Sequence, residues 1–235
     1  MTVAAVILHA RMEGALADAA GRPAVRRAVE SAWAGGATPI VVVAFDDGGQ
    51  VAAALTGSPA VLAEPAPMEA GPVGQMARGI AVALDQVTET EAALIWPGRM
   101  AWIDAETVTT LIEAYGARRG SVLRPVYEGE PGWPVLVPVD LVPALVALGP
   151  SLMPDVLMNE FFAGAASSAT IDTGDPGVVH DIATAMESLP LFEGPPQPVS
   201  GAAPEWGAAA AEMPDDAPLE GPALAPYAQA ADEGD

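Results

Sequence analysis

Four polar side chains stand out because each one comes shortly after an apolar stretch of the chain. They are His9, Arg11, Arg99 and Asp181. An imidazole can donate a hydrogen bond to a ligand or act as a general base. A guanidinium binds two phosphate oxygens at once, and a carboxylate can hold a divalent cation. Arg99 is therefore a candidate for direct contact with a phosphate, and His9 for a hydrogen bond to a ligand.

Structural explanations stay open for two of these residues. An isolated histidine at the end of a strand often packs as a neutral, hydrogen-bonded residue, and no partner triad accompanies His9. Arg99 lies close in sequence to Asp104 and Glu106, so a surface salt bridge to one of them would also explain it.

The elements that carry these residues alternate between short apolar runs and helix-like repeats. The apolar runs predict strands and the repeats, with their capping residues and glycine stops, predict helices. Asp104 is the expected N-cap of one helix, and Asp46-Asp47 is expected to form a turn and helix start. The predicted strands are residues 3–8, 39–45, 60–63, 92–96, 121–124, 133–137 and 169–172, and the helices are 22–34, 48–55, 73–87, 104–118, 139–148, 154–163 and 178–189.

This alternation predicts an α/β fold with a doubly wound, mostly parallel sheet, because strands that are apolar on both faces must be covered by helices on both sides. In such sheets ligands bind beyond the carboxyl ends of the strands. The four polar residues are therefore expected at one edge of the sheet.

Composition excludes several kinds of chemistry. The 235 residues contain no cysteine and no lysine, which excludes disulfides, thiolate metal sites and lysine Schiff bases. The net charge of −22 argues against nucleic acid and against an anionic membrane surface as partners. We expect a cytoplasmic protein, because no signal-like or membrane-spanning stretch is found in the sequence.

The composition changes near Pro190. Residues 191–235 contain no basic residue, nine acidic residues and eight prolines. Such a segment buries too little apolar surface to offset its ordering entropy. We therefore predict one domain over residues 1–190 and a disordered acidic tail over 191–235. The tail either is merely solvated or contacts a partner through Trp206 or Tyr227.

Several segments, in order along the chain, resemble the MobA-like nucleotidyltransferases, particularly the molybdenum-cofactor cytidylyltransferases. The opening strand leads into His9-Ala10-Arg11-Met12-Glu13-Gly14, which resembles the end of the family's phosphate loop. Later matching segments are Gly21-Arg22-Pro23, Gly71-Pro72, 125–129, Gly132-Trp133-Pro134-Val135-Leu136 and 172–184. The resemblance implies a Rossmann-like nucleotidyltransferase fold, CTP or GTP as substrate, Mg²⁺ as cofactor and a phosphorylated acceptor.

The sequence departs from the family pattern in four places. The Gly-rich loop is shortened, and the family's catalytic lysine is missing. The turn that normally carries a metal-binding aspartate is Gly98-Arg99-Met100-Ala101, and the closing element keeps Asp181 but has Ala183 in place of the second aspartate. Loss of one positioned electrostatic group typically costs ~10²–10³ in rate. We therefore expect impaired catalysis, no catalytic or metal-binding residues, and doubtful binding of Mg²⁺ and of CTP or GTP.

Candidate ligand-binding residues follow from the strand ends and the resemblance. They are His9, Arg11, Met12, Gly14, Gly71, Pro72, Arg99, Asp104, Trp133 and Asp181. Trp96, Trp102 and Trp133 are expected to fill the cleft, to form a contact surface, or to pack in the core.

Three functions remain open. The first is a non-catalytic protein that binds a partner protein or a cofactor; by analogy with the family alone, that partner would be a molybdoenzyme or a maturation factor. The second is an active transferase whose rearranged site uses Arg11, Arg99 and Asp181. The third is a structural subunit of a homodimer or heterodimer.

Overall fold

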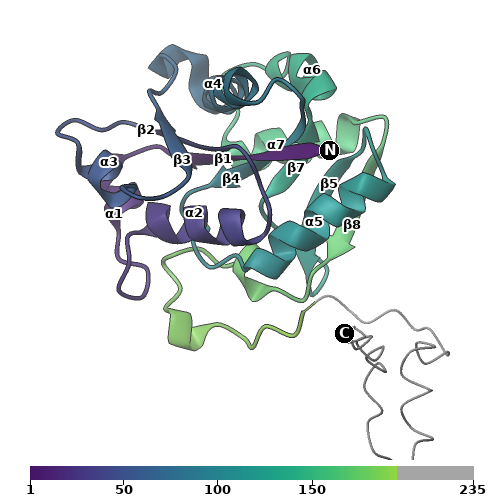
Figure 1. Ribbon diagram of the computed structural model, residues 1–235. Helices are drawn as coiled ribbons and strands as arrows, with labels where there is room; N and C mark the ends of the chain where they lie inside the picture. Colours follow the sequence, from purple (N-terminus) through teal and green to yellow (C-terminus); the bar gives the residue numbers. More distant parts are fainter. Residues whose placement is uncertain (195–235) are drawn as a thin grey trace, which may run out of the picture. The chain divides into compact units, whose positions relative to one another are not determined.

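The computed structural model describes residues 1–194, which form one mixed sheet of eight strands with helices on both faces (Figure 1). The strand order is β3-β2-β1-β4-β7-β5-β6, and β8, which lies off this path, also pairs with β5. The strands are β1 (Thr2–His9), β2 (Ile40–Ala44), β3 (Ala60–Ala63), β4 (Thr90–Pro97), β5 (Val122–Tyr127), β6 (Glu130–Pro131), β7 (Val135–Pro138) and β8 (Ser168–Asp172).

The predicted α/β class with a mostly parallel sheet is confirmed. Strands β1 to β4 pair in parallel, as do β5 and β8, whereas β7 lies antiparallel between β4 and β5. All five residues of β2 are buried, and β1 and β4 are almost entirely so. Burial on both faces explains why these strands are uninterrupted apolar runs.

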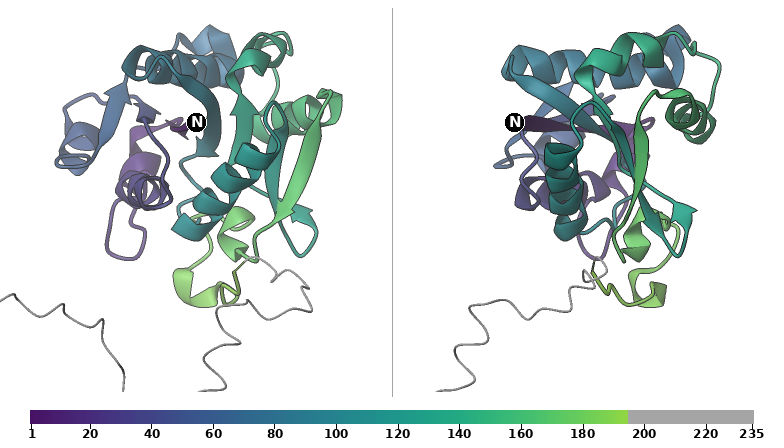
Figure 2. Two further views of the ribbon diagram at one scale, coloured as in Figure 1. Left: turned by 45° about the vertical axis from the view of Figure 1, so that its right-hand side comes forward. Right: turned by 90° about the vertical axis from the view of Figure 1, so that its right-hand side faces the viewer.

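The helices cover the two faces of this sheet (Figure 2). One face carries α4 (Gly71–Gln86), with α6 (Val142–Val146) and α7 (Pro154–Gly164) packed against it. The other carries α2 (Ala24–Ala34) and α5 (Ala105–Ala117), which pack against each other. Two short helices, α1 (Met12–Leu16) and α3 (Gln50–Ala54), lie beside α2.

The helix-starting roles predicted for Asp104 and Asp46 are confirmed. The Asp104 carboxylate accepts from the Glu106 amide at 2.9 Å and caps α5. The Asp46 carboxylate accepts from the amides of Val51 and Ala52 at 2.9 and 3.0 Å, so Asp46 starts α3 as predicted.

The helix predicted over residues 178–189 is wrong. The chain there forms only two short 3₁₀ turns, Pro176–Val178 and Met186–Ser188. Ile182 and Leu189 pack against a small cluster that contains Trp102, and the Ala183 amide donates to the Asp181 carboxylate at 2.9 Å. Packing on the Trp102 cluster and this local turn take the place of the predicted helix.

The helix predicted over residues 139–148 is shorter than expected. It divides into a 3₁₀ turn, Val139–Leu141, and α6, because Pro143 at the start of α6 has no amide hydrogen to continue the first turn.

The last described residues still contact the domain. The Glu193 amide donates to the Gly174 carbonyl at 3.3 Å. The rest of the predicted tail, residues 195–235, lies outside the described residues, so the predicted disorder stays a prediction. Within residues 1–194, no helix has the length and apolar character needed to cross a membrane.

Candidate functional site

A polar groove lies at the carboxyl edge of the sheet, with a volume of about 320 Å³. The turn after β4, strand β5, the segment before β7, helix α7 and the chain after β8 form its walls. Its lining includes Arg99, Arg124, Glu130, Trp133, Asp155, Asn159 and Asp181.

Arg99 lies between two carboxylates in this groove. Its Nη2 donates to both oxygens of Asp155, at 3.0 and 3.1 Å, and its Nε is 3.9 Å from Asp181. The Asp155 carboxylate also accepts from the indole Nε1 of Trp133 at 3.0 Å. The expectation that Arg99 would pair with Asp104 or Glu106 is wrong, since Asp155 on α7 is closer in space although 56 residues away in sequence.

A second arginine, Arg124 on β5, is buried, with only 5% of its surface exposed. Its Nε donates to the Gly132 carbonyl at 3.0 Å, and its Nη1 donates to the side-chain oxygen of Asn159. Burial lowers the pKa of this guanidinium, and the negative charge of Asp155 opposes that shift. Both direct acceptors, a carbonyl and an amide oxygen, are neutral. The buried positive charge of Arg124 is therefore stabilised by hydrogen bonds to polar groups and not by a salt bridge.

His9 at the end of β1 is packed beneath the turn that carries Arg99. A Cβ atom added to Gly98 would lie 2.0 Å from the ring of His9, so the histidine requires glycine at that position. Burial lowers the pKa of the imidazole to about 4, and His9 is neutral at pH 7. Its Nε2 has no hydrogen-bond partner among the described residues. This environment is that of a packing residue rather than a proton donor or base.

The phosphate loop expected at the end of β1 is reduced to Ala10 and Arg11. Helix α1 begins at Met12, with Arg11 as its N-cap residue, and Gly14 lies inside this helix. Arg11 is exposed, and Met12 packs against the core. Backbone amides of a long loop, which surround a phosphate in the usual anion sites of such folds, are therefore absent between β1 and α1.

Gly71 and Pro72 begin α4, and another part of the chain lies against Gly71. Gly71 has φ +62°, and a Cβ atom there would lie 2.0 Å from the carbonyl oxygen of Pro150. The loop between α6 and α7 thus occupies the space directly over Gly71.

The three tryptophans singled out in the sequence are buried in the domain. Trp96, Trp102 and Trp133 are all buried, with 0%, 8% and 3% of their surfaces exposed. Each indole donates within the domain: Trp96 to the Met100 carbonyl, Trp102 to the carbonyls of Asp181 and Thr184, and Trp133 to Asp155. Arg27 lies over the ring of Trp102, 5.0 Å from its centroid.

Behind the groove, the Asp175 carboxylate ties the end of β8 to the start of α5. It accepts from the Asp104 amide, the Thr107 hydroxyl and the Gly177 amide at 2.9, 2.7 and 2.7 Å. Burial raises the pKa of Asp175, against the opposing effect of these three donors. This network holds in place the segment that leads to Asp181.

The residues present do not fit the magnesium ion that the family resemblance implies. Mg²⁺ needs near-octahedral oxygen ligation with carboxylates, and here a guanidinium lies between the two carboxylates of the groove. In residues 1–194, no group of three or more histidine, aspartate and glutamate side chains is arranged to hold a metal ion.

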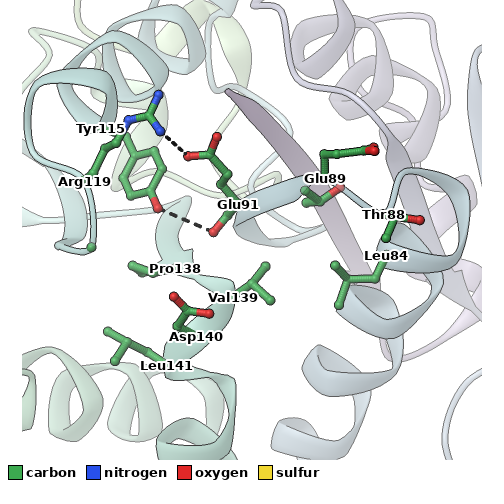
Figure 3. Close-up of a pocket in the computed structure, with 12 residues that line it drawn as sticks. Leu84, Thr88, Glu89, Glu91, Tyr115, Arg119, Pro138, Val139, Asp140 and Leu141 are labelled. Carbon is green, nitrogen blue, oxygen red and sulfur yellow. Dashed lines mark hydrogen bonds and ion pairs between the residues drawn. The ribbon is translucent and has the colours of Figure 1, made fainter.

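A larger groove, of about 770 Å³, lies at the opposite edge of the sheet (Figure 3). It is lined by Leu84, Thr88, Glu89, Thr90, Glu91, Tyr115, Arg119, Gly120 and residues 138–141. Its central carboxylate, Glu91, is already paired with Arg119 at 2.9 Å and with the N-terminal ammonium at 3.7 Å. None of the ten candidate residues lines it.

The structure thus gathers three of the ten candidates, Arg99, Trp133 and Asp181, in the smaller groove. His9 packs against Gly98, and Asp104 caps α5. Of the remaining five, Arg11 lies in the β1–α1 connection, Met12 and Gly14 in α1, and Gly71 and Pro72 at the start of α4. Sequence reasoning missed Arg124, Asp155, Asn159 and Asp175. A charged residue inside an apolar strand was the available signal for Arg124, and spacing of four residues on one helix was the signal for Asp155 and Asn159.

Comparison with known proteins identifies the class and then the family. The fold is that of nucleotidyltransferases: a Methanothermobacter thermautotroptrophicus nucleotidyl transferase is 16% identical, with a TM-score of 0.61, and the match covers 77% of this chain and 91% of that one. Residues 10–157 match the model of the MobA-like NTP transferase domain, and the chain belongs to that family.

Two further structures are similar. The 4-diphosphocytidyl-2C-methyl-D-erythritol synthase of Anaerococcus prevotii is 13% identical, with a TM-score of 0.60 over 78% of this chain and 93% of that one. A Mycobacterium tuberculosis protein in complex with manganese is 16% identical, with a TM-score of 0.54 over 73% and 89%. At these identities the likeness shows the fold alone. No curated protein matches the sequence.

Proposed function

We propose that this chain is a non-catalytic member of the MobA-like family, which acts by binding a partner protein or a cofactor and does not transfer a nucleotidyl group. The observation that carries this proposal is the position of Arg99 between Asp155 and Asp181. A fixed positive charge there neutralises the carboxylates that would otherwise attract a divalent cation.

Two features near the carboxyl end of β1 and the start of α4 support the same conclusion. The β1–α1 connection is too short to surround a triphosphate, and the Pro150 carbonyl lies against Gly71. The metal site and the phosphate loop are parts that the family resemblance assigns to transfer chemistry. Both are altered in this chain, and their losses together leave little scope for catalysis.

By family analogy alone, the bound molecule would be a molybdoenzyme or a maturation factor. An active transferase that uses Arg11, Arg99 and Asp181 is the second candidate. The groove that still contains Arg99 and Asp181 favours it, whereas the exposed position of Arg11 outside that groove does not.

The decisive experiment measures calorimetric binding of CTP, GTP and ATP, each with and without Mg²⁺, together with pyrophosphate release in the presence of a phosphorylated acceptor. We expect no Mg²⁺-dependent nucleotide binding and no pyrophosphate release. Micromolar, Mg²⁺-dependent binding of CTP or GTP with release of pyrophosphate would overturn the proposal in favour of the active enzyme.

A further inference from the structure

Arg124 is the side chain in the groove whose charge is least well balanced. It is 5% exposed, yet no carboxylate of residues 1–194 forms a salt bridge with it. Asp155 is the nearby carboxylate that influences it, but Asp155 is already bonded to Arg99 and Trp133. A buried charge without an ionic partner lowers the stability of the folded protein, and a bound anion would offset that cost.

The geometry around Arg124 leaves room for that countercharge. Two of its three nitrogens are used, Nε by the Gly132 carbonyl and Nη1 by Asn159. Within the described part of the chain, no acceptor is hydrogen-bonded to Nη2, and Arg124 lines the groove. A guanidinium that lines a groove and has a nitrogen without an acceptor is a donor set for an oxyanion.

We propose that the groove binds a single small anionic group, a carboxylate or a phosphate monoester, through Arg124. This inference rests on the proposed function, because it names the chemistry by which a partner or cofactor is held. Helix α7 shapes the site: Asp155 and Asn159 lie four residues apart on it, so that Asp155 engages Arg99 while the amide of Asn159 orients Arg124 without neutralising it.

Charge and size limit the ligand to one anionic group. The groove contains two guanidinium groups and three carboxylates, Glu130, Asp155 and Asp181. The whole chain carries a net charge of −22. A triphosphate would meet strong repulsion there, whereas one oxyanion only balances Arg124. A groove of about 320 Å³ is at the small end of ligand sites, large enough for a small molecule or one terminal group of a larger partner.

The test is titration of the full chain with inorganic phosphate and, separately, with acetate, at constant ionic strength set by chloride. Calorimetry and the thermal unfolding midpoint are recorded for each. We expect saturable binding of at least one of the two anions with a Kd on the order of 1 mM, because an anion with so few atoms can make only a few contacts. Tighter phosphate binding assigns a phosphate monoester, and tighter acetate binding assigns a carboxylate.

The discriminating variant is Asn159→Asp, which places a carboxylate on Arg124 from within the chain. Asn159 is exposed, so the variant should fold. We expect its affinity for the anion to fall at least about tenfold and its midpoint without anion to rise by about 2–4 °C. Gln86→Glu is the matched control: it adds the same charge at an exposed position at the end of α4, and it should bind the anion as the wild type does.

Equal anion affinity in the wild type and Asn159→Asp would overturn this inference, as would absence of saturable binding of either anion to the wild type. Neither result bears on nucleotidyl transfer, which the pyrophosphate assay measures separately. Conversely, detection of transfer would overturn the proposed function while the anion titration still reported on Arg124. The two proposals can therefore fail independently.

Discussion

The two halves of the sheet's carboxyl edge are built differently. Beside β1, the space is filled by the chain itself: His9 packs under Gly98, α1 starts at Met12, and the Pro150 carbonyl lies on Gly71. Beside β5, the space stays open and polar, with Arg99 and Arg124 facing α7. The first half is filled by packed residues, whereas the second is an open polar groove.

This difference is relevant to the proposed function, in which the chain binds one molecule and does not transfer a nucleotidyl group. A protein that has closed one half and kept the other polar can still hold one ligand. The predictions below test each half in turn.

The largest effect is expected at Asp175, which supports the open half from behind. Asp175→Ala leaves two amides and the Thr107 hydroxyl without their buried acceptor, which should lower the free energy of unfolding by about 4 kcal/mol. Urea unfolding measures this. Asp172→Ala is the control: Asp172 is exposed and accepts only from the Gly174 amide, so a loss as large as that of Asp175→Ala would show that the network is unimportant.

The pH dependence of stability tests whether His9 is buried and neutral in the closed half. Its pKa is lowered from 6.5 to about 4 in the folded protein, so the unfolded chain binds the proton more tightly. The stability conferred by neutral His9 is present above pH 6.5 and is lost as the pH falls toward 4, by about 3 kcal/mol in total.

The measurement is urea unfolding of the wild type and His9→Leu between pH 7.5 and 4. The difference between their unfolding free energies should change across this window as His9 becomes protonated in the unfolded state. Met76→Leu is the control, a buried apolar substitution without a titrating group. A wild-type curve parallel to that of His9→Leu would mean that His9 is not the buried neutral residue described above.

A substitution of Arg99 tests whether its guanidinium prevents metal binding in the open half. Arg99→Asp replaces the central cation by a third carboxylate beside Asp155 and Asp181. We expect the variant to gain Mn²⁺ binding at least about tenfold tighter than the wild type, which corresponds to at least about 1.4 kcal/mol. Calorimetry with Mn²⁺ measures it, and Arg78→Asp, an equal charge change at an exposed arginine of α4, is the control. Similar Mn²⁺ affinity in both variants would contradict the assigned role of Arg99.

The smallest effect is expected at Arg27, which lies on the ring of Trp102 and donates to the Ala101 carbonyl at 3.1 Å. Arg27→Met keeps most of the apolar stem and removes the charge. It should lower the free energy of unfolding by about 1 kcal/mol in urea unfolding. A change indistinguishable from that of Arg118→Met, an exposed arginine at the end of α5, would show that the stacking contributes little.

Local pattern in the sequence was sufficient for most of the fold. The buried strands β1, β2 and β4 are continuous apolar runs, and Asp46 and Asp104 are helix-starting residues whose roles depend on neighbours only a few positions away. The helix prediction for segment 178–189 is wrong because residues of this segment contact Trp102. Trp102 lies about 80 positions away in the sequence, and local periodicity does not show such a contact.

The candidate site also has features that depend on the sequence alone and features that depend on the tertiary structure. The sequence by itself determined that no lysine or cysteine takes part, that an arginine stands in the turn after β4, and that the β1–α1 connection is short. Only the tertiary structure decided that Arg99 meets Asp155, that Arg124 meets Asn159, and that Pro150 covers Gly71. These pairs join residues 35 to 79 positions apart in the chain, and which partners meet depends on the order of strands and the packing of α7 rather than on any local sequence signal.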